Sequence, residues 1–244
     1  MRAATTGLKH KIEVLAAWIM DARKLVVFTG AGISTESGLP DFRGPDGLWT
    51  RQNKGLPAGD TSQWAAAAPN AGHRAIVDIQ NLDRLTFLIS QNVDNLHLKS
   101  GIHPEILAEL HGNLTKIRCT ACEFTLDNMD DGIACPLCGG KMVPSVVNFG
   151  QPLPKRDLEN AVHYSSEADL FLVIGSSLVV YPAADMPRLA IENGARLVII
   201  NQGKTPLDRV ASIRFYEKIG EVLPPTVEIL RQKMKLVAGG LHGK

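Results

Sequence analysis

The sequence predicts an α/β fold, a Rossmann-like, doubly wound parallel sheet interrupted by a small inserted domain. Short apolar runs have strand length, longer segments between them have helical spacing, and all cysteines gather in one stretch. The expected strands are 24–28, 84–90, 170–175 and 196–201. The expected helices are 8–23, 70–81, 182–193 and 219–237. Strands that alternate with helices in this way form parallel sheets.

Two stretches do not fit this alternation. Residues 40–69 are rich in Gly, Pro, Asp and Asn, which predicts a long loop, and such loops in compact domains are usually functional or mobile. Residues 114–143 contain every cysteine and predict a module inserted between the two parts of the larger domain, 1–113 and 144–244. In the last helix, Pro224 and Pro225 are expected to delay or break the start.

The chain of 244 residues is long enough for one large α/β domain and a small insert. Its 26 basic and 25 acidic residues give a net charge of +1, which favours neither nucleic acid nor a membrane surface as a partner. The apolar runs are too short to span a bilayer, and the N-terminus lacks the apolar segment of a secretory signal. We therefore expect a cytoplasmic protein.

The cysteines form two CxxC pairs, with Cys119 and Cys122 in the first and Cys135 and Cys138 in the second. Two such turns can aim four sulfurs at one Zn²⁺, about 2.3 Å from each. An iron–sulfur cluster, a redox CxxC or a nucleic-acid-binding ribbon are the alternatives. The paired spacing favours zinc, and four sulfur ligands leave no open position for catalysis. The sequence therefore predicts a structural zinc site.

A glycine-rich loop, GAGISTESG, follows the first expected strand and opens an expected helix. Glycines there let the backbone approach a diphosphate, and a helix N-terminus favours negative charge. The loop departs from GxGxxG because Thr35 stands at the third glycine position, and it lacks the Gly-Lys-Ser/Thr ending of a P-loop. A tight strand–helix turn without a ligand is the alternative interpretation.

Further polar residues stand at the ends of expected strands. They occur in QNVDNLH after residue 90, in GSS at 175–177 and at Asn201, while PDFRG continues the glycine loop and His111 precedes the cysteine module. Open α/β sheets bind ligands at the carboxyl ends of their strands. The sequence therefore predicts that these groups converge on one crevice.

These motifs occur in a fixed order: GAGIS and GLPDFRG (30–44), QNVDNLH (91–97), HG (111–112), the four-cysteine module, VVNFG (146–150), GSSLVVYP (175–182) and INQGKTPLD (200–208). Together they resemble the sirtuin family of NAD-dependent protein deacylases, from about residue 8 to residue 235. The resemblance implies NAD as a co-substrate and Zn²⁺ as a structural ion. The residues that it assigns to NAD are Gly30, Ala31, Gly32, Ser34, Thr35, Asp41, Phe42, Arg43, Trp49, Gln91, Asn92, Val93, Asp94, His111, Gly175, Ser176, Ser177, Asn201 and Ile219.

In the family's reaction the acyl oxygen attacks C1′ of the nicotinamide ribose, nicotinamide leaves, and a base then activates a ribose hydroxyl. The resemblance makes His111 that base and Asn92 a second catalytic residue. An imidazole pKa near ~6.5 suits base chemistry at neutral pH. The acylated lysine of a protein or peptide would lie against a strand whose backbone pairs with the substrate. The residues of that strand are Val146, Val147, Asn148, Phe149 and Gly150.

The expected function is NAD-dependent deacylation of protein lysines, either deacetylation or removal of a longer acyl group. Gln151 stands where many members have Glu, and no Ala-x-x-Tyr-x-x-Arg pattern follows Trp49, so desuccinylation is not the first choice. Mono-ADP-ribosylation of proteins at the same pocket stays open. A non-catalytic module that binds NAD and zinc also stays open, although His111 and Asn92 argue against it.

Overall fold

The computed structural model describes residues 2–44, 47–56, 64, 66–127 and 132–240. Within these residues the larger sheet has six parallel strands in the order β3-β2-β1-β7-β8-β9. The strands are β1 Leu25–Thr29, β2 Phe87–Ser90, β3 Leu107–Glu109, β7 Leu170–Ile174, β8 Arg196–Ile200 and β9 Ile213–Phe215. The predicted Rossmann-like parallel sheet is confirmed.

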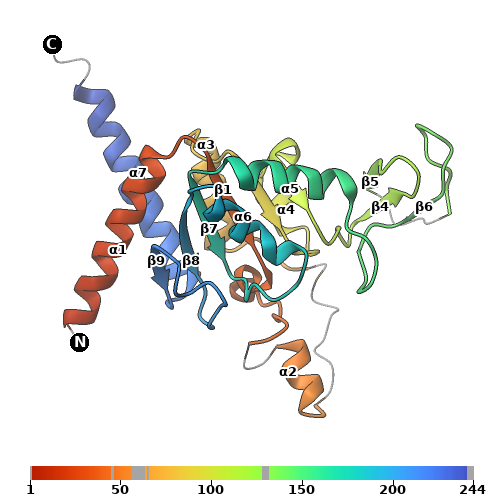
Figure 1. Ribbon diagram of the computed structural model, residues 1–244, viewed down its shortest axis with the longest axis horizontal. Coiled ribbons are helices and arrows are strands. Elements are labelled where there is room, and N and C mark those ends of the chain that lie inside the picture. The colour runs from red at the N-terminus through yellow and green to blue at the C-terminus, as the bar shows by residue number, and fades with distance from the viewer. Residues whose placement is uncertain (1, 45–46, 57–63, 65, 128–131, 241–244) are drawn as a thin grey trace.

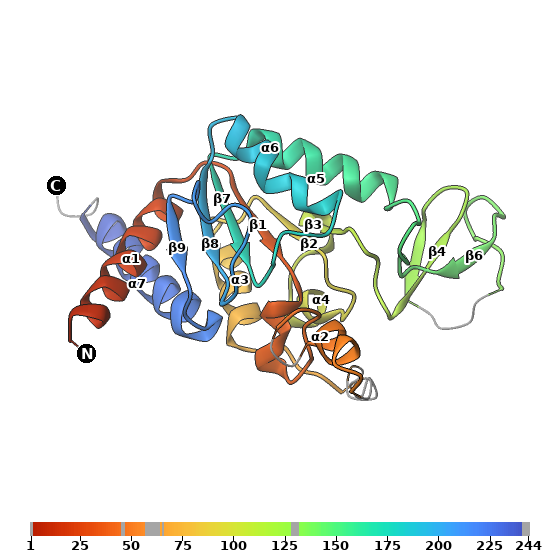
Figure 2. The same cartoon turned by 60° about the horizontal axis from the view of Figure 1, so that its bottom comes forward.

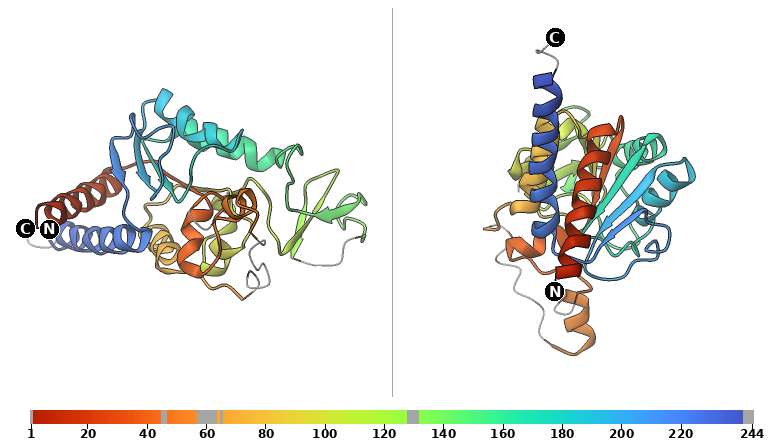
Figure 3. Two further views of the ribbon diagram at one scale, coloured as in Figure 1. Left: turned by 90° about the horizontal axis from the view of Figure 1, so that it is seen from below. Right: turned by 90° about the vertical axis from the view of Figure 1, so that its left-hand side faces the viewer.

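Helices cover both faces of this sheet (Figures 1 and 2). On one face lie α1 (Arg2–Asp21), α3 (Ala71–Asn81) and α7 (Ile219–Gly240); on the other lie α5 (Lys155–Glu167) and α6 (Met186–Glu192). Successive residues of β1 point to opposite faces, so Val27 packs in the first core and Val26 in the second. Helices α1 and α7 lie side by side at the far end of the molecule (Figure 3).

The remaining helices are short. They are α2 (Leu48–Asn53), α4 (Leu96–Ser100) and 3-10 helices at Ala31–Ser37, Pro104–Ile106 and Ala183–Asp185. Across the described residues, no helix combines the length and apolarity that a membrane crossing requires.

A second, antiparallel sheet lies at one end of the molecule, apart from the parallel sheet (Figure 2). Its strands are β4 (Lys116–Cys119), β5 (Thr125–Asp127) and β6 (Met142–Pro144), with β4 in the centre. This places the inserted module where the cysteines predicted it, while the domain boundaries 1–113 with 144–244, and 114–143, stay a prediction.

Two expectations about where helices form were wrong. Helix α7 begins at Ile219 and contains Pro224 and Pro225, so the prolines neither delay nor break its start. Its apolar face, including Val222 and Leu223, is buried in the core, and that packing outweighs the missing amide hydrogen bonds. The expected loop 40–69 contains α2, whose segment LWTRQN has neither glycine nor proline and is anchored by a hydrogen bond from Leu48 N to Asp41 O (2.8 Å).

Glu123 connects the inserted module to the larger domain. It follows the second cysteine in a left-handed conformation (φ 61°), and its carboxylate accepts hydrogen bonds from Lys155 N (2.8 Å) and Arg156 N (3.0 Å). Those amides belong to the first turn of α5, where Pro154 provides no side-chain cap. Glu123 of the inserted module therefore provides acceptors for amides at the N-terminus of α5 in the larger domain.

We expect Glu123→Ala to lower the free energy of unfolding by about 1 kcal/mol, because two amides at a helix N-terminus lose their acceptor. Urea denaturation of the zinc-loaded protein measures this. The control is Glu159→Ala, an exposed residue of the same helix whose ion pair with Lys155 spans 3.8 Å. Equal stabilities for the two variants would contradict the capping role.

Candidate functional site

A cavity of about 1320 Å³ opens at the carboxyl ends of β1, β2, β7 and β8. All residues that the resemblance assigned to NAD or to the substrate line it, with the exception of Trp49. The side chain of Trp49 lies outside the described part of the structure. The predicted convergence of these groups on one crevice is therefore observed.

The loops that follow β1 and β7 approach each other closely because glycines lie where they meet. Gly32 N donates to Gly175 O (2.8 Å), and a Cβ atom at Gly32 would lie 2.7 Å from the same oxygen. Gly175 itself has a left-handed φ of 65°, and a Cβ there would lie 2.3 Å from Ile33 N. The absence of side chains leaves a narrow backbone cradle of the kind that suits a diphosphate. The loop opens a seven-residue 3-10 helix, however, so the expected contribution of an α-helix dipole is small.

Asn92 and Asp94 form a buried polar wall with Ser34. Ser34 Oγ donates to Asp94 Oδ2 (2.6 Å) and accepts from Asn92 Nδ2 (3.2 Å). The other carboxylate oxygen of Asp94 accepts from Leu96 N (2.9 Å). Asn92 Oδ1 is buried with no partner among the described residues. A buried acceptor without a partner suits an N–H donor of a ligand, such as a carboxamide.

Two buried histidines, His73 and His97, do not line the cavity. His97 Nε2 lies 2.8 Å from Thr29 Oγ1, and its ring lies 5.1 Å from the ring of His73. Burial lowers the pKa of His97 to about 4. Burial, together with His97, lowers the pKa of His73 to about 3. Both rings are therefore neutral at physiological pH.

The tautomer of His111 is fixed by its partner. His111 Nδ1 lies 2.9 Å from the Gln91 carbonyl oxygen, which can only accept, so Nδ1 holds the proton and Nε2 keeps its lone pair. Burial lowers the pKa of His111, and the hydrogen bond to Gln91 only partly opposes this shift. The side chain is therefore a neutral base at neutral pH.

The segment 146–150 lies against His111. Val147 N donates to His111 O (2.9 Å), and a Cβ atom at Gly112 (φ 76°) would lie 2.0 Å from Ser145 O, so this approach requires glycine. The expected strand at 146–150 is not formed: residues 146–148 belong to no strand, and the chain turns at Phe149 and Gly150. The turn forms because Gln151 N donates to Asn148 O and Gln151 Oε1 accepts from Asn148 N.

The Sir2 family profile matches residues 30–61 and 56–182. The chain belongs to the Sir2 family. NAD-dependent protein deacetylase 1 of Bradyrhizobium diazoefficiens is 40% identical over 253 residues, covering 93% of this chain and 99% of that protein. NAD-dependent protein deacylase 2 of Archaeoglobus fulgidus is 36% identical, covering 92% and 98%. A solved structure of Sir2 with a p53 peptide and NAD⁺ has a TM-score of 0.66 at 33% identity, covering 91% and 96%.

The cysteine cluster of this Sir2 protein has the geometry of a zinc site. All four Sγ atoms lie within 4.8 Å of one another, with separations of 3.5 Å for Cys119–Cys138 and 3.7 Å for Cys122–Cys135. Tetrahedral bonds of about 2.3 Å place sulfurs about 3.8 Å apart. Ala121 N also points at Cys119 Sγ (3.4 Å), which suits a thiolate. The four residues therefore fit Zn²⁺, which would be held away from the cavity.

Sequence reasoning missed several cavity residues of this Sir2 protein. They are Glu36, Leu39, Pro40, Gly44, Thr50, Trp64, Gln151, Leu153, Val179, Val180, Tyr181, Pro182, Gln202, Gly203, Lys204 and Lys218. Several of these residues lie next to assigned residues in the same motifs, so proximity in sequence was the available signal. Trp64 belongs to no motif, and its place in the predicted 40–69 loop was the available signal.

We expect Cys135→Ser to lower the melting temperature and the soluble yield, because a four-thiolate zinc site contributes folding free energy. Metal analysis and thermal denaturation measure this together. Thr120→Ser is the control, since the shorter residue keeps the hydroxyl that donates to Lys141 O (3.2 Å). A variant that loses zinc and keeps its melting temperature would show that the site is no folding element.

Proposed function

We propose that this Sir2 protein is an NAD-dependent protein-lysine deacylase that transfers the acyl group to ADP-ribose and releases nicotinamide. The observation that supports this best is the position of His111. Its Nε2 is an available base in a cavity that also contains the glycine cradle and the 146–150 segment. The names of the relatives in bacteria and archaea support the same activity.

The residues of the wall would orient the co-substrate. We assign Gly30, Ala31, Gly32, Ser34 and Thr35 to the diphosphate, and Asn92 with Asp94 to the nicotinamide carboxamide. NAD, when bound, supplies the ADP-ribose acceptor and nicotinamide as the leaving group. Asp94, which lines the cavity, would accept a hydrogen bond from the carboxamide N–H. The adenosine half would lie against Ser176, Ser177, Asn201 and Ile219, which line the cavity.

His111 would take a proton from a ribose hydroxyl at Nε2, while Nδ1 stays bound to the Gln91 carbonyl. Val147 and Phe149 would flank the acyl-lysine and exclude water. The backbone of residues 146–148 lines the cavity and belongs to neither sheet, so a peptide strand could pair with it. We therefore infer an acylated lysine in an extended peptide as the second substrate.

All four cysteines belong to the two CxxC pairs of the proposed zinc site, which fits a reducing compartment, and we infer the cytosol as the site of action. The balanced charge gives no reason to expect nucleic acid or a membrane as a partner.

We expect wild-type protein with NAD and acylated peptides to release nicotinamide and O-acyl-ADP-ribose in equal amounts. A panel from acetyl to myristoyl, with succinyl and lactyl peptides, identifies the acyl group, and mass spectrometry quantifies both products. Absence of NAD turnover on the whole panel would refute the proposal. ADP-ribose attached to protein without deacylated peptide would instead show mono-ADP-ribosylation, and NAD binding without turnover would show a binding module.

We expect His111→Ala to lower kcat by about a hundredfold or more, because the reaction loses its general base. Steady-state nicotinamide release at saturating peptide and NAD measures this. His10→Ala is the control, since His10 is an exposed residue of α1 distant from the cavity lining. An unchanged kcat in the folded His111→Ala protein would remove His111 from its assigned role.

The pH profile tests the same residue independently. Burial holds the pKa of His111 below its ordinary value of 6.5, so the neutral, active form persists at lower pH than for an exposed histidine. We expect kcat/KM, which reports the free enzyme, to fall at acidic pH with a midpoint below 6.5. Measurement from about pH 5 to about pH 8.5 covers this range. A midpoint above 6.5 would contradict a desolvated base.

A further inference from the structure

The loop that follows β8 forms the end of the cavity on the β9 side of the sheet. Asn201, Gln202, Gly203 and Lys204 line the cavity but belong to no helix or strand. Asn201 N donates to Phe215 O (3.1 Å), and Asn201 Nδ2 donates to Gly203 O (2.9 Å). The orientation of Asn201 therefore depends on where the Gly203 carbonyl is held.

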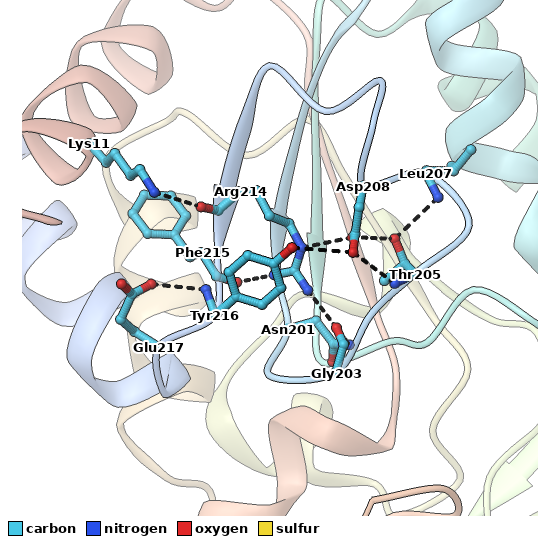
Figure 4. Close-up of polar contacts among 10 residues, drawn as sticks. All are labelled: Lys11, Asn201, Gly203, Thr205, Leu207, Asp208, Arg214, Phe215, Tyr216 and Glu217. Carbon is cyan, nitrogen blue, oxygen red and sulfur yellow. Dashed lines mark hydrogen bonds and ion pairs between the residues drawn. The ribbon is translucent and has the colours of Figure 1, made fainter. Parts of the chain in front are cut away.

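Arg214 on β9 holds that carbonyl (Figure 4). Its guanidinium donates to Gly203 O and to Phe215 O, and its Nε lies 2.8 Å from Asp208 Oδ1. The Tyr216 ring covers the guanidinium at 3.9 Å from its centroid. The side chain is only 10% exposed, so these contacts are shielded from water. Arg214 thus joins Gly203 and Asp208 to its own strand at Phe215.

Asp208 is in turn fixed by Thr205. Its carboxylate accepts from Thr205 Oγ1 (2.7 Å) and from Thr205 N (3.2 Å). Burial alone would raise the pKa of Asp208, but the hydrogen bonds from Thr205 and Arg214 outweigh it and lower the pKa. The ion pair between Asp208 and Arg214 therefore stays charged at neutral pH. The hydrogen bonds between Thr205 and Asp208 close the turn after Lys204.

We propose that Arg214 is a positioning residue for the adenosine end of the NAD site, acting through Gly203 and Asn201. This inference rests on the proposed function. A planar guanidinium has five donors in a fixed fork, so it can bind Asp208 and two carbonyls at once. A lysine ammonium could replace the ion pair but could not reach all three acceptors in that geometry.

The position of Arg214 predicts a selective effect. The nicotinamide end is held by separate contacts, between Ser34 and Asp94 and between His111 and Gln91. The described contacts of Arg214 and Asp208 include none of these residues. A loosened β8 loop should therefore weaken binding of ADP-ribose and NAD while leaving the peptide KM and the rate at saturating NAD nearly intact.

The experiment compares Arg214→Met and Arg214→Lys with wild type in the full chain. Titration calorimetry with ADP-ribose and NAD needs no turnover, and we expect Arg214→Met to raise both Kd values about tenfold. Arg214→Lys should show a smaller rise, and Asp208→Asn provides a second route to a loosened loop if Arg214→Met does not fold. Arg209→Met is the matched control, because Arg209 is an exposed arginine in the same loop.

A rise in KM for NAD, with the peptide KM and kcat within about twofold of wild type, supports positioning. Unchanged Kd values in folded Arg214 and Asp208 variants would overturn it. A rise in the peptide KM together with a fall in kcat would also overturn the positioning role, because it would show general destabilisation. If wild type binds neither ligand, the proposed function itself fails, and the positioning inference fails with it.

Discussion

The parallel pairing of β1 with β7 determines the geometry of the site. From β1 the chain continues to β2 and β3 on one side, whereas β7 continues to β8 and β9 on the other. The loops that follow β1 and β7 therefore leave the same edge of the sheet and diverge, which opens a crevice between them. The hydrogen bond from Gly32 to Gly175 closes the base of that crevice. Bulk at either glycine would force the two strands apart and displace the cavity walls.

Much of the architecture could be predicted because buried parallel strands have a strong signature. The apolar runs ending near Thr29, Ser90 and Ile174 coincide with β1, β2 and β7. The three-residue strands β3 and β9 are too short for periodicity to reveal. Prolines within α7 could not be interpreted correctly from local propensity, since tertiary packing of the helix decides the outcome.

The site was predictable where chemistry lies in contiguous motifs. The glycine loop and the residues after β2 meet in the cavity, as their places at strand ends predicted, and the cysteine pairs meet in a separate cluster, as their spacing predicted. Contacts between distant residues were not predictable, because a single sequence does not show which side chain meets which backbone. Glu123 with Lys155, and Arg214 with Gly203, are pairs of this kind. Each connects a segment with no motif of its own to a segment that lies on, or leads to, the cavity.

These contacts give the cavity two independently anchored ends. The 146–150 segment runs from β6 of the cysteine module to α5, and Glu123 attaches the module to the first turn of that helix. The β8 loop at the other end is attached to β9 through Arg214. His111 contacts only the first of these ends directly: its carbonyl accepts from Val147 N, and its Nδ1 bonds to the Gln91 carbonyl after β2. The proposed base therefore takes its position from the backbone at Gln91 and from the 146–150 segment, whereas the β8 loop is held separately through Arg214.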